Sequence, residues 1–516
     1  MSEPIVLDYA AKLGDDEPAT LRADAARLWR LALPSIGFAV SRLVLGQMDF
    51  VMLTWTGTDA VAAISPATFL VFVVQSVGMG LAMSAQTFAA QALGRGRPKE
   101  GAAYVWQAIY VAGLFAMLSW PMIAAMPRFW AWIGHAPAVR ELEIAYCQIT
   151  FISMAFSVVC AALDGYFNGL HKPRITLTSI LAAVVVNGFW NYVLIFGKLG
   201  FPAMGIRGAA IATVLAWIVR SGIMFCVFMS PRNAREFGTR DEWRFNWNRL
   251  AAMVRVGGPT GVQWILDIGA WFVFMACLVG PFGKIVLAAS NLAVQYTYYS
   301  FMPAIGIGIA VASKVGHSIG RHRPDLARRY TRVGMIMAGS YMLVMGLILA
   351  LFRTPLIALF SSDPEVIRIG ATLMIWVAVF QVFDAMQIIY TNALRGAGET
   401  RFPAIAVAVH CWVIFVGGGW LMTHYVPSWG YHGPWMTGTL YIALLGLVLW
   451  RRFESGRWER IQLFKDDAAP ASGGPFEGPL ANGPLVNGPL SDSPLASGVP
   501  PAESDGAAEV ATADVV

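Results

Sequence analysis

The sequence predicts an all-α integral membrane protein whose twelve transmembrane helices form two parallel six-helix repeats around a central cleft. Hydrophobic residues make up 57% of the 516 positions, charged residues only 13%, and the mean hydropathy is +0.58. Soluble domains carry about 25% charged residues, so this chain lacks the polar groups that would cover a soluble surface. Residues 104–126 and 402–422 contain no Asp, Glu, Lys or Arg. Each is longer than the roughly 20 residues that cross a bilayer as a helix.

Apolar runs along the chain predict the individual spans. They lie near residues 28–54, 60–92, 104–126, 142–168, 174–197, 205–229, 250–279, 286–317, 330–352, 366–394, 402–424 and 433–450. The predicted organisation is an N-terminal segment (1–27), a six-helix lobe (28–229), a linker (230–249), a second lobe (250–452) and a tail (453–516).

The charges of the loops predict the orientation. Loops on one side of the predicted spans carry 22 Lys and Arg residues, and those on the other side carry five. Since basic loops stay in the cytoplasm, we expect both termini to be cytoplasmic in a multi-pass plasma (inner) membrane protein. Residues 1–28 lack the apolar stretch of a signal peptide.

Short motifs recur at offsets of 225 to 228 residues. The pairs are Arg30/Pro34 with Arg255/Pro259, Gly57 with Gly283, Gly78/Gly80 with Gly306/Gly308, Gly94-Arg95-Gly96 with Gly320-Arg321-His322, and Asn168-Gly169 with Arg395-Gly396. Six spans separate the copies, so both halves cross the membrane in the same direction. Such parallel repeats are a common transporter architecture.

The C-terminal tail and the cysteines suggest no folded site. Residues 466–516 hold eight acidic and no basic residues, with repeated Gly-Pro-Leu units, which is typical of a disordered, solvated tail. Docking through the Leu positions is the alternative. The five cysteines lie singly in apolar segments, which argues against disulfides or a zinc site.

The motifs also resemble those of one transporter family. They are Leu33-Pro34 through Gly46-x-x-Asp49-x-x-Met52, Gln86-Thr87 through Gln91-Ala92-x-Gly94, Asn187-x-x-x-Asn191-Tyr192, Gly208-Ala209-Ala210-Ile211-Ala212-Thr213, Val315-Gly316 through Gly320, and Gln381-x-x-Asp384 through Arg395-Gly396. In order and spacing they resemble the multidrug and toxic compound extrusion (MATE) family, NorM-type branch, over about residues 28 to 450. The resemblance implies export of organic compounds driven by inward Na⁺ or H⁺.

Three acids inside predicted spans are candidates for the coupling-ion site. Ionisable groups inside a bilayer are expensive and usually functional. Asp384 and Asp267 match the family's acidic positions in the second lobe, and Asp49 matches one in the first. A carboxylate binds H⁺ directly or offers oxygen ligands to Na⁺, so Na⁺ at Asp384 and Asp267 is one possibility. A fixed ion pair that only positions helices is the other interpretation.

The sequence departs from the family at several of these positions. Relatives often carry Glu at Asp267, some carry a second first-lobe carboxylate at Asn191, and some carry Tyr at Phe380. Asn187 and Asn191 lie four residues apart on one helix face, so they are predicted either to hydrogen-bond Asp49 or to join helices.

Arg42 stands where relatives usually carry an uncharged amide. It lies seven residues before Asp49, on the same helix face and about 10.5 Å away along the axis. One interpretation pairs Arg42 with Asp49, and the other assigns it to an anionic substrate in the cleft. Asp164, near the end of the fourth span, is predicted to pair with Lys172 or Arg174.

The predicted function is secondary active export of hydrophobic organic, drug-like and cationic compounds in exchange for Na⁺ or H⁺. The sequence shows no ATP-binding motif and no catalytic constellation, so no enzyme activity or cofactor is expected beyond the coupling ion. Small-molecule substrates and membrane lipids are the expected partners, without nucleic acid or an obligate protein. Two alternatives stay open at this point: a flippase for a lipid-linked precursor, which fourteen spans would favour, and a membrane enzyme acting on lipid.

Overall fold

The computed structural model describes residues 20–464, in which every regular element is a helix and no strand occurs. Twelve helices in this range are long and apolar enough to cross a membrane. The predicted fold class and number of spans are therefore confirmed. Residues 1–19 and 465–516 lie outside the described residues, and with them most of the predicted N-terminal segment (1–27) and most of the predicted tail (453–516). The first residues of that tail are ordered, because α18 continues to Glu454 and a short helix follows over Arg457–Arg460, where Trp458 is fully buried.

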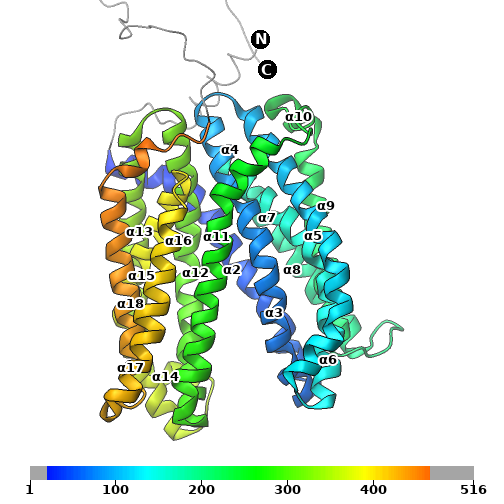
Figure 1. Ribbon diagram of the computed structural model, residues 1–516, viewed down its shortest axis with the longest axis vertical. Helices are drawn as coiled ribbons and strands as arrows, with labels where there is room; N and C mark the ends of the chain where they lie inside the picture. The colour runs from blue at the N-terminus through cyan, green and yellow to red at the C-terminus, as the bar shows by residue number, and fades with distance from the viewer. Residues whose placement is uncertain (1–19, 465–516) are drawn as a thin grey trace, which may run out of the picture. The chain divides into compact units, whose positions relative to one another are not determined.

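The spans of the first half are α2 (Leu21–Leu53), α3 with α4 (Thr58–Met83, Ala85–Gly94), α5 (Pro98–Ile133), α6 with α7 (Pro137–Thr150, Met154–Gly169), α8 (Pro173–Phe196) and α9 (Ile206–Phe228). In Figure 1 helices α3 to α9 of the first half lie together on the right, whereas α2 begins on the left behind the helices of the second half. Proline stands at the first position of α5, α6 and α8. Its missing N–H costs nothing there, and its φ is already helical.

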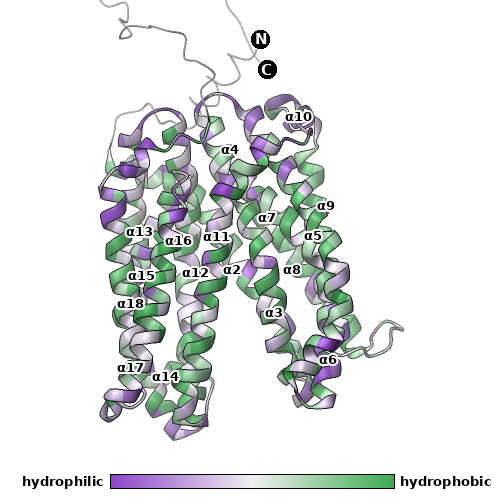
Figure 2. Ribbon diagram, in the orientation of Figure 1, coloured by the Kyte–Doolittle hydropathy of each residue, from purple (hydrophilic) through white to green (hydrophobic). Residues whose placement is uncertain are grey.

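The spans of the second half contain two π-helical segments. They are α11 (Trp247–Val273) with η2 (Phe274–Val279) and η3 (Gly280–Phe282), α12 (Lys284–Gly320), α13 (Pro324–Leu351), α15 (Pro364–Gly396), α16 with η4 and α17 (Arg401–Val409, His410–Gly417, Gly418–Tyr425), and α18 (His432–Glu454). Short helices α10 (Pro231–Phe237) and α14 (Arg353–Ala358) lie between spans. Hydrophobic residues cover the middle of the spans, and hydrophilic ones gather near their ends, including around α10 and α6 (Figure 2).

The first span begins at Leu21, seven residues before the predicted start. Thr20 caps it by accepting a hydrogen bond from the backbone N–H of Ala23. Asp24 is buried and ion-paired with Arg329 of α13. This ion pair explains why the helix begins earlier than predicted. The polar residues that precede the apolar run are held in the helix by a contact with the opposite half of the chain.

Glycines from both repeats bring the two halves into backbone contact. A Cβ added at Gly94 would lie 2.2 Å from the carbonyl oxygen of His317, and one added at Gly320 would lie 2.2 Å from that of Gln91. Gly320 lies 226 residues after Gly94, and His317 lies 226 residues after Gln91, so the two contacts are equivalent under exchange of the repeats. Close backbone approach through small residues is typical of membrane helix packing. The interface thus has the approximate two-fold symmetry that the sequence repeat predicts.

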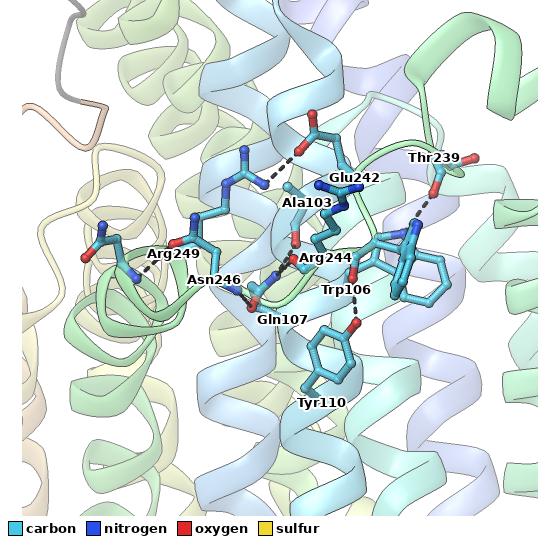
Figure 3. Close-up of polar contacts among 11 residues, drawn as sticks. Ala103, Trp106, Gln107, Tyr110, Thr239, Glu242, Arg244, Asn246 and Arg249 are labelled. Carbon is cyan, nitrogen blue, oxygen red and sulfur yellow. Dashed lines mark hydrogen bonds and ion pairs between the residues drawn. The ribbon is translucent and has the colours of Figure 1, made fainter.

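The segment predicted as a linker (230–249) is bound to α5 through its backbone (Figure 3). Trp106 donates to the carbonyl of Thr239 at 2.8 Å, and Tyr110 donates to that of Trp243. Gln107 donates to the carbonyl of Arg244 at 3.0 Å and accepts from the N–H of Asn246 at 3.1 Å. The linker therefore follows α5 by main-chain contacts that do not depend on the linker's own side chains.

Asn246 connects this contact to the second half. Its side chain accepts from the N–H groups of Asn248 and Arg249 and so caps α11. The start of the seventh span is thereby fixed against a helix of the first six.

We expect Gln107→Leu to lower the thermal stability of the purified protein. The side chain is buried, and its loss leaves a linker carbonyl and a linker N–H without their partner, each costing about 1–3 kcal/mol. A melting curve in detergent measures the change. Gln295→Leu is the control, because that amide donates only to Tyr299 one turn away in the same helix. Equal melting temperatures for both variants would contradict a structural role of the linker contact.

Candidate functional site

Asp49 lies near the end of α2 inside a polar cluster built by three helices. Its Oδ1 accepts hydrogen bonds from Asn191 at 2.6 Å and from Asn187 at 3.1 Å. Its Oδ2 accepts from the hydroxyl of Thr213 on α9. Asp49 is 7% exposed and both asparagines are fully buried. The predicted hydrogen bonds from Asn187 and Asn191 are confirmed, and Thr213 is an additional member.

The spacing of the asparagines explains the geometry. Residues four apart on α8 face the same side, so both amides reach one carboxylate, and Asn191 also donates to Asn187 at 3.1 Å. Three donors surround Asp49, and no described cationic side chain forms an ion pair with it. Hydrogen bonds alone therefore support this buried carboxylate.

Asp267 on α11 lies in a second polar cluster, in the other half of the chain. Its Oδ1 accepts from the hydroxyl of Tyr441 on α18 at 3.1 Å and faces the thiol of Cys411 at 3.8 Å. The Tyr441 ring stacks on Phe415, with centroids 5.4 Å apart. Cys411 and Phe415 both belong to the π-helix η4. Such bulges often occur at functional sites because they redirect side chains and backbone groups.

Asp384 on α15 is the nearby second carboxylate of this cluster. It is buried at 9% exposure, and its charged neighbour is Asp267. Among the described residues, no hydrogen bond or ion pair involves the Asp384 carboxylate. Asp267 and Asp384, which lie 117 positions apart in the chain, are thus within electrostatic range of each other, and no cationic side chain in residues 20–464 forms an ion pair with either.

Arg42 on α2 lies near a different acid than Asp49. Its charged neighbours are Arg220 on α9 and Asp164 on α7. Nη2 of Arg220 donates to both oxygens of Asp164, at 2.6 and 2.7 Å. The pairing of Arg42 with Asp49 is therefore wrong: the two share a helix face, but Asp49 is not among the charged neighbours of Arg42, and no hydrogen bond or ion pair among the described residues joins them.

The predicted partner of Asp164 is also wrong. Lys172 contacts Glu236 of α10 at 3.4 Å, whereas Asp164 is bound by Arg220. Asp164 points into the bundle towards α9 because α7 and α9 pack together. Sequence reasoning missed Arg220, Thr213 and Tyr441. An arginine in the middle of the apolar helix Ile206–Phe228, whose other arginine is Arg207 at its second position, was the signal available for Arg220.

A helical bundle with ionisable groups inside its spans and an internal duplication defines a secondary membrane transporter. The MatE family model matches two segments, residues 34–193 and 266–421, one in each half and together more than half of the chain. The chain belongs to the MatE family of multidrug efflux transporters, and the predicted NorM-type relationship is confirmed. It is therefore a transporter and not an enzyme.

Known proteins are similar over most of this chain. A Neisseria meningitidis protein described as "Probable multidrug resistance protein NorM" is 29% identical over 430 residues, covering 82% of this chain and 92% of the relative. A Thermotoga maritima protein of the same description is 28% identical and covers 84% and 93%. The crystal structure of a Vibrio cholerae MATE transporter matches with a TM-score of 0.77 at 18% identity, covering 84% of this chain and 97% of that one. The last similarity concerns the fold.

Proposed function

We propose that this transporter exports hydrophobic organic compounds, drug-like cations among them, in exchange for Na⁺ or H⁺ that moves inward. Asp384 and Asp267 form the main coupling-ion site, and Asp49 is a second position. The observation that carries the proposal is the pair of neighbouring carboxylates with no cationic partner among the described residues. Two negative charges within electrostatic range of each other in a low-dielectric interior favour uptake of a proton or a cation.

The surroundings of the pair suit a small, transient cation. Carboxylates and a hydroxyl are the hard oxygen ligands that Na⁺ takes, and Tyr441 supplies the hydroxyl beside Asp267. Within residues 20–464, no group of three or more His, Cys, Asp or Glu side chains forms a metal cluster. A weak site is what coupling requires, because the ion must bind on one side and leave on the other.

Coupling follows if ion binding changes the balance between two conformations. A ligand shifts a conformational equilibrium only by its difference in affinity for the two states. We propose that filling the Asp384–Asp267 site stabilises one arrangement of the halves and that substrate stabilises the other. The ion gradient then drives export without direct contact between ion and substrate.

The proposed orientation follows the loop charges. The end of the bundle that holds α10 and the basic loops faces the cytoplasm, in the inner membrane of the cell. The flippase alternative is not proposed, because the described residues contain twelve candidate spans and not fourteen.

Transport by the purified protein in proteoliposomes tests the proposal. Ethidium movement is measured under an imposed Na⁺ gradient and, separately, under an imposed H⁺ gradient. We expect movement against the dye gradient under at least one of them, and its loss when an ionophore collapses that gradient. Movement that is indifferent to both gradients would disprove the exchange mechanism.

A further inference from the structure

The first half of the chain contains a second polar layer, closer to the start of α2 than Asp49 is. Asp49 on α2 is bonded to Thr213 on α9, and these two spans run in opposite directions. Seven residues back along α2 is Arg42, and seven residues forward along α9 is Arg220. Seven residues are two turns of helix, about 10.5 Å. Because α2 and α9 are antiparallel, Arg42 and Arg220 therefore lie at the same level of the bundle, on the helix faces that carry Asp49 and Thr213.

Contacts around Arg220 support this register. Its guanidinium carbon lies 5.4 Å from the ring centroid of Phe38, one turn before Arg42 on α2. Arg42 in turn has Arg220, Asp164 and Cys160 as its electrostatic neighbours. Three helices, α2, α7 and α9, thus contribute to one layer.

The hydrogen bonds of this layer are incomplete. Both oxygens of Asp164 accept from a single nitrogen of Arg220, Nη2. Arg220 is 2% exposed, yet its Nε has no hydrogen-bond partner. A buried guanidinium N–H without an acceptor is costly, because charged donors lose more on desolvation than neutral ones. An additional acceptor would remove that cost.

Arg42 has donors available as well. Among the described residues, it forms no hydrogen bond or ion pair, and it is half-buried. Gly46, one turn further along the same face, is exposed, and an added Cβ there meets no atom within 4 Å. The surface of α2 is therefore open at Gly46, between Arg42 and Asp49.

We propose that Arg42 and Arg220 form a binding subsite for the carboxylate of an organic anion. Two guanidinium groups and the single carboxylate of Asp164 leave one net positive charge in the layer, which matches a monoanion better than a phosphate dianion. Guanidinium groups bind a planar carboxylate through parallel N–H donors. The subsite rests on the proposed export function and extends its substrates to organic acids.

Equilibrium binding to the purified full-length protein tests the subsite without any gradient. The probes are naphthalene-2-carboxylate, the neutral naphthalene-2-carboxamide and the cationic 2-naphthylmethylammonium, titrated in detergent by calorimetry. The wild type is expected to bind the carboxylate at least about 10-fold more tightly than the amide, as charge-assisted hydrogen bonds provide. Arg42→Gln should remove that preference and leave amide and cation binding within about 2-fold. Arg42→Lys, which keeps the charge, should retain part of it.

Two matched variants complete the design. Arg368→Gln removes an exposed arginine paired with Glu365 on α15 and should change nothing. The double variant Arg220→Gln with Asp164→Asn removes one positive and one negative charge together, so it avoids a buried unpaired ion. It should weaken carboxylate binding while amide binding persists, and the amide titration shows that the variant is folded.

Three outcomes would overturn the subsite. They are equal wild-type affinity for carboxylate and amide, an intact carboxylate preference in Arg42→Gln, and equal weakening of all three probes in Arg42→Gln, which assigns Arg42 a structural role. Failure of ion-driven ethidium transport concerns the exchange mechanism and leaves these binding results unaffected, so the two hypotheses fail separately.

Discussion

Asp384→Asn is expected to stop gradient-driven export while substrate binding remains measurable. Asparagine has nearly the shape of a protonated aspartic acid but never carries a charge. The carboxylate pair with Asp267 is then permanently reduced to one charge, and the coupling ion loses its difference in affinity between states. We expect the export rate to fall by at least about 10-fold, within the usual range of coupling energies.

Two further substitutions sharpen this test. Asp267→Asn should give the same defect, because both carboxylates contribute to one site, while Tyr441 can still contact the amide. Asp59→Asn is the control, since that aspartate lies exposed in the first turn of α3. Proteoliposome transport measures export, and dye binding in detergent measures substrate affinity. Full gradient-driven export in both Asp384→Asn and Asp267→Asn would make these acids structural.

The fold was predictable because each span satisfies the bilayer's requirement by its own composition. All twelve apolar runs became helices, since backbone groups inside a membrane must be paired within the segment. The ends were less predictable. The first span extends back to Leu21 because Asp24 finds Arg329 on α13, a contact that no local pattern reveals.

The candidate site was predictable only in part, for a similar reason. Asn187 and Asn191 were placed near Asp49 because the family motif and the helical spacing agree. Arg42 shares a helix face with Asp49, but spacing on one helix does not say which neighbouring helix supplies a closer charge. The charged neighbours of Arg42 are the ion-paired Arg220 and Asp164, and only the packing of α2, α7 and α9 shows this.

Gly94→Ala is expected to have the second large effect on transport, because the two halves of the chain touch at Gly94. The added Cβ would lie 2.2 Å from the carbonyl oxygen of His317 and 3.0 Å from Cα of Gly320. Both are backbone atoms that cannot rotate away, so the clash is removed only if the two halves separate at the end where α4 meets α12. Overpacking of this kind costs about 1–3 kcal/mol, which changes a two-state equilibrium by roughly 5- to 150-fold.

Gly94→Ala should therefore disfavour the conformation described by this structure and slow a transport cycle that passes through it. Gly113→Ala is the control, because a Cβ at that position in α5 meets no atom within 4 Å. Gly320→Ala should reproduce the defect, since its Cβ would lie 2.2 Å from the carbonyl of Gln91 in the equivalent contact. Proteoliposome transport measures the rate, and detergent melting curves separate slowed cycling from loss of fold.

Thiol labelling reports the conformation directly. Ser313 is 2% exposed and accepts a hydrogen bond from Gln86 of the opposite half, so a cysteine there is protected while the halves touch. In a background with Cys226→Ser and Cys277→Ser, which removes the exposed thiols, Ser313→Cys should react slowly. Adding Gly94→Ala should raise its labelling rate by about 5-fold or more. If labelling and transport match those of Gly113→Ala, the glycine contact does not control the equilibrium between conformations.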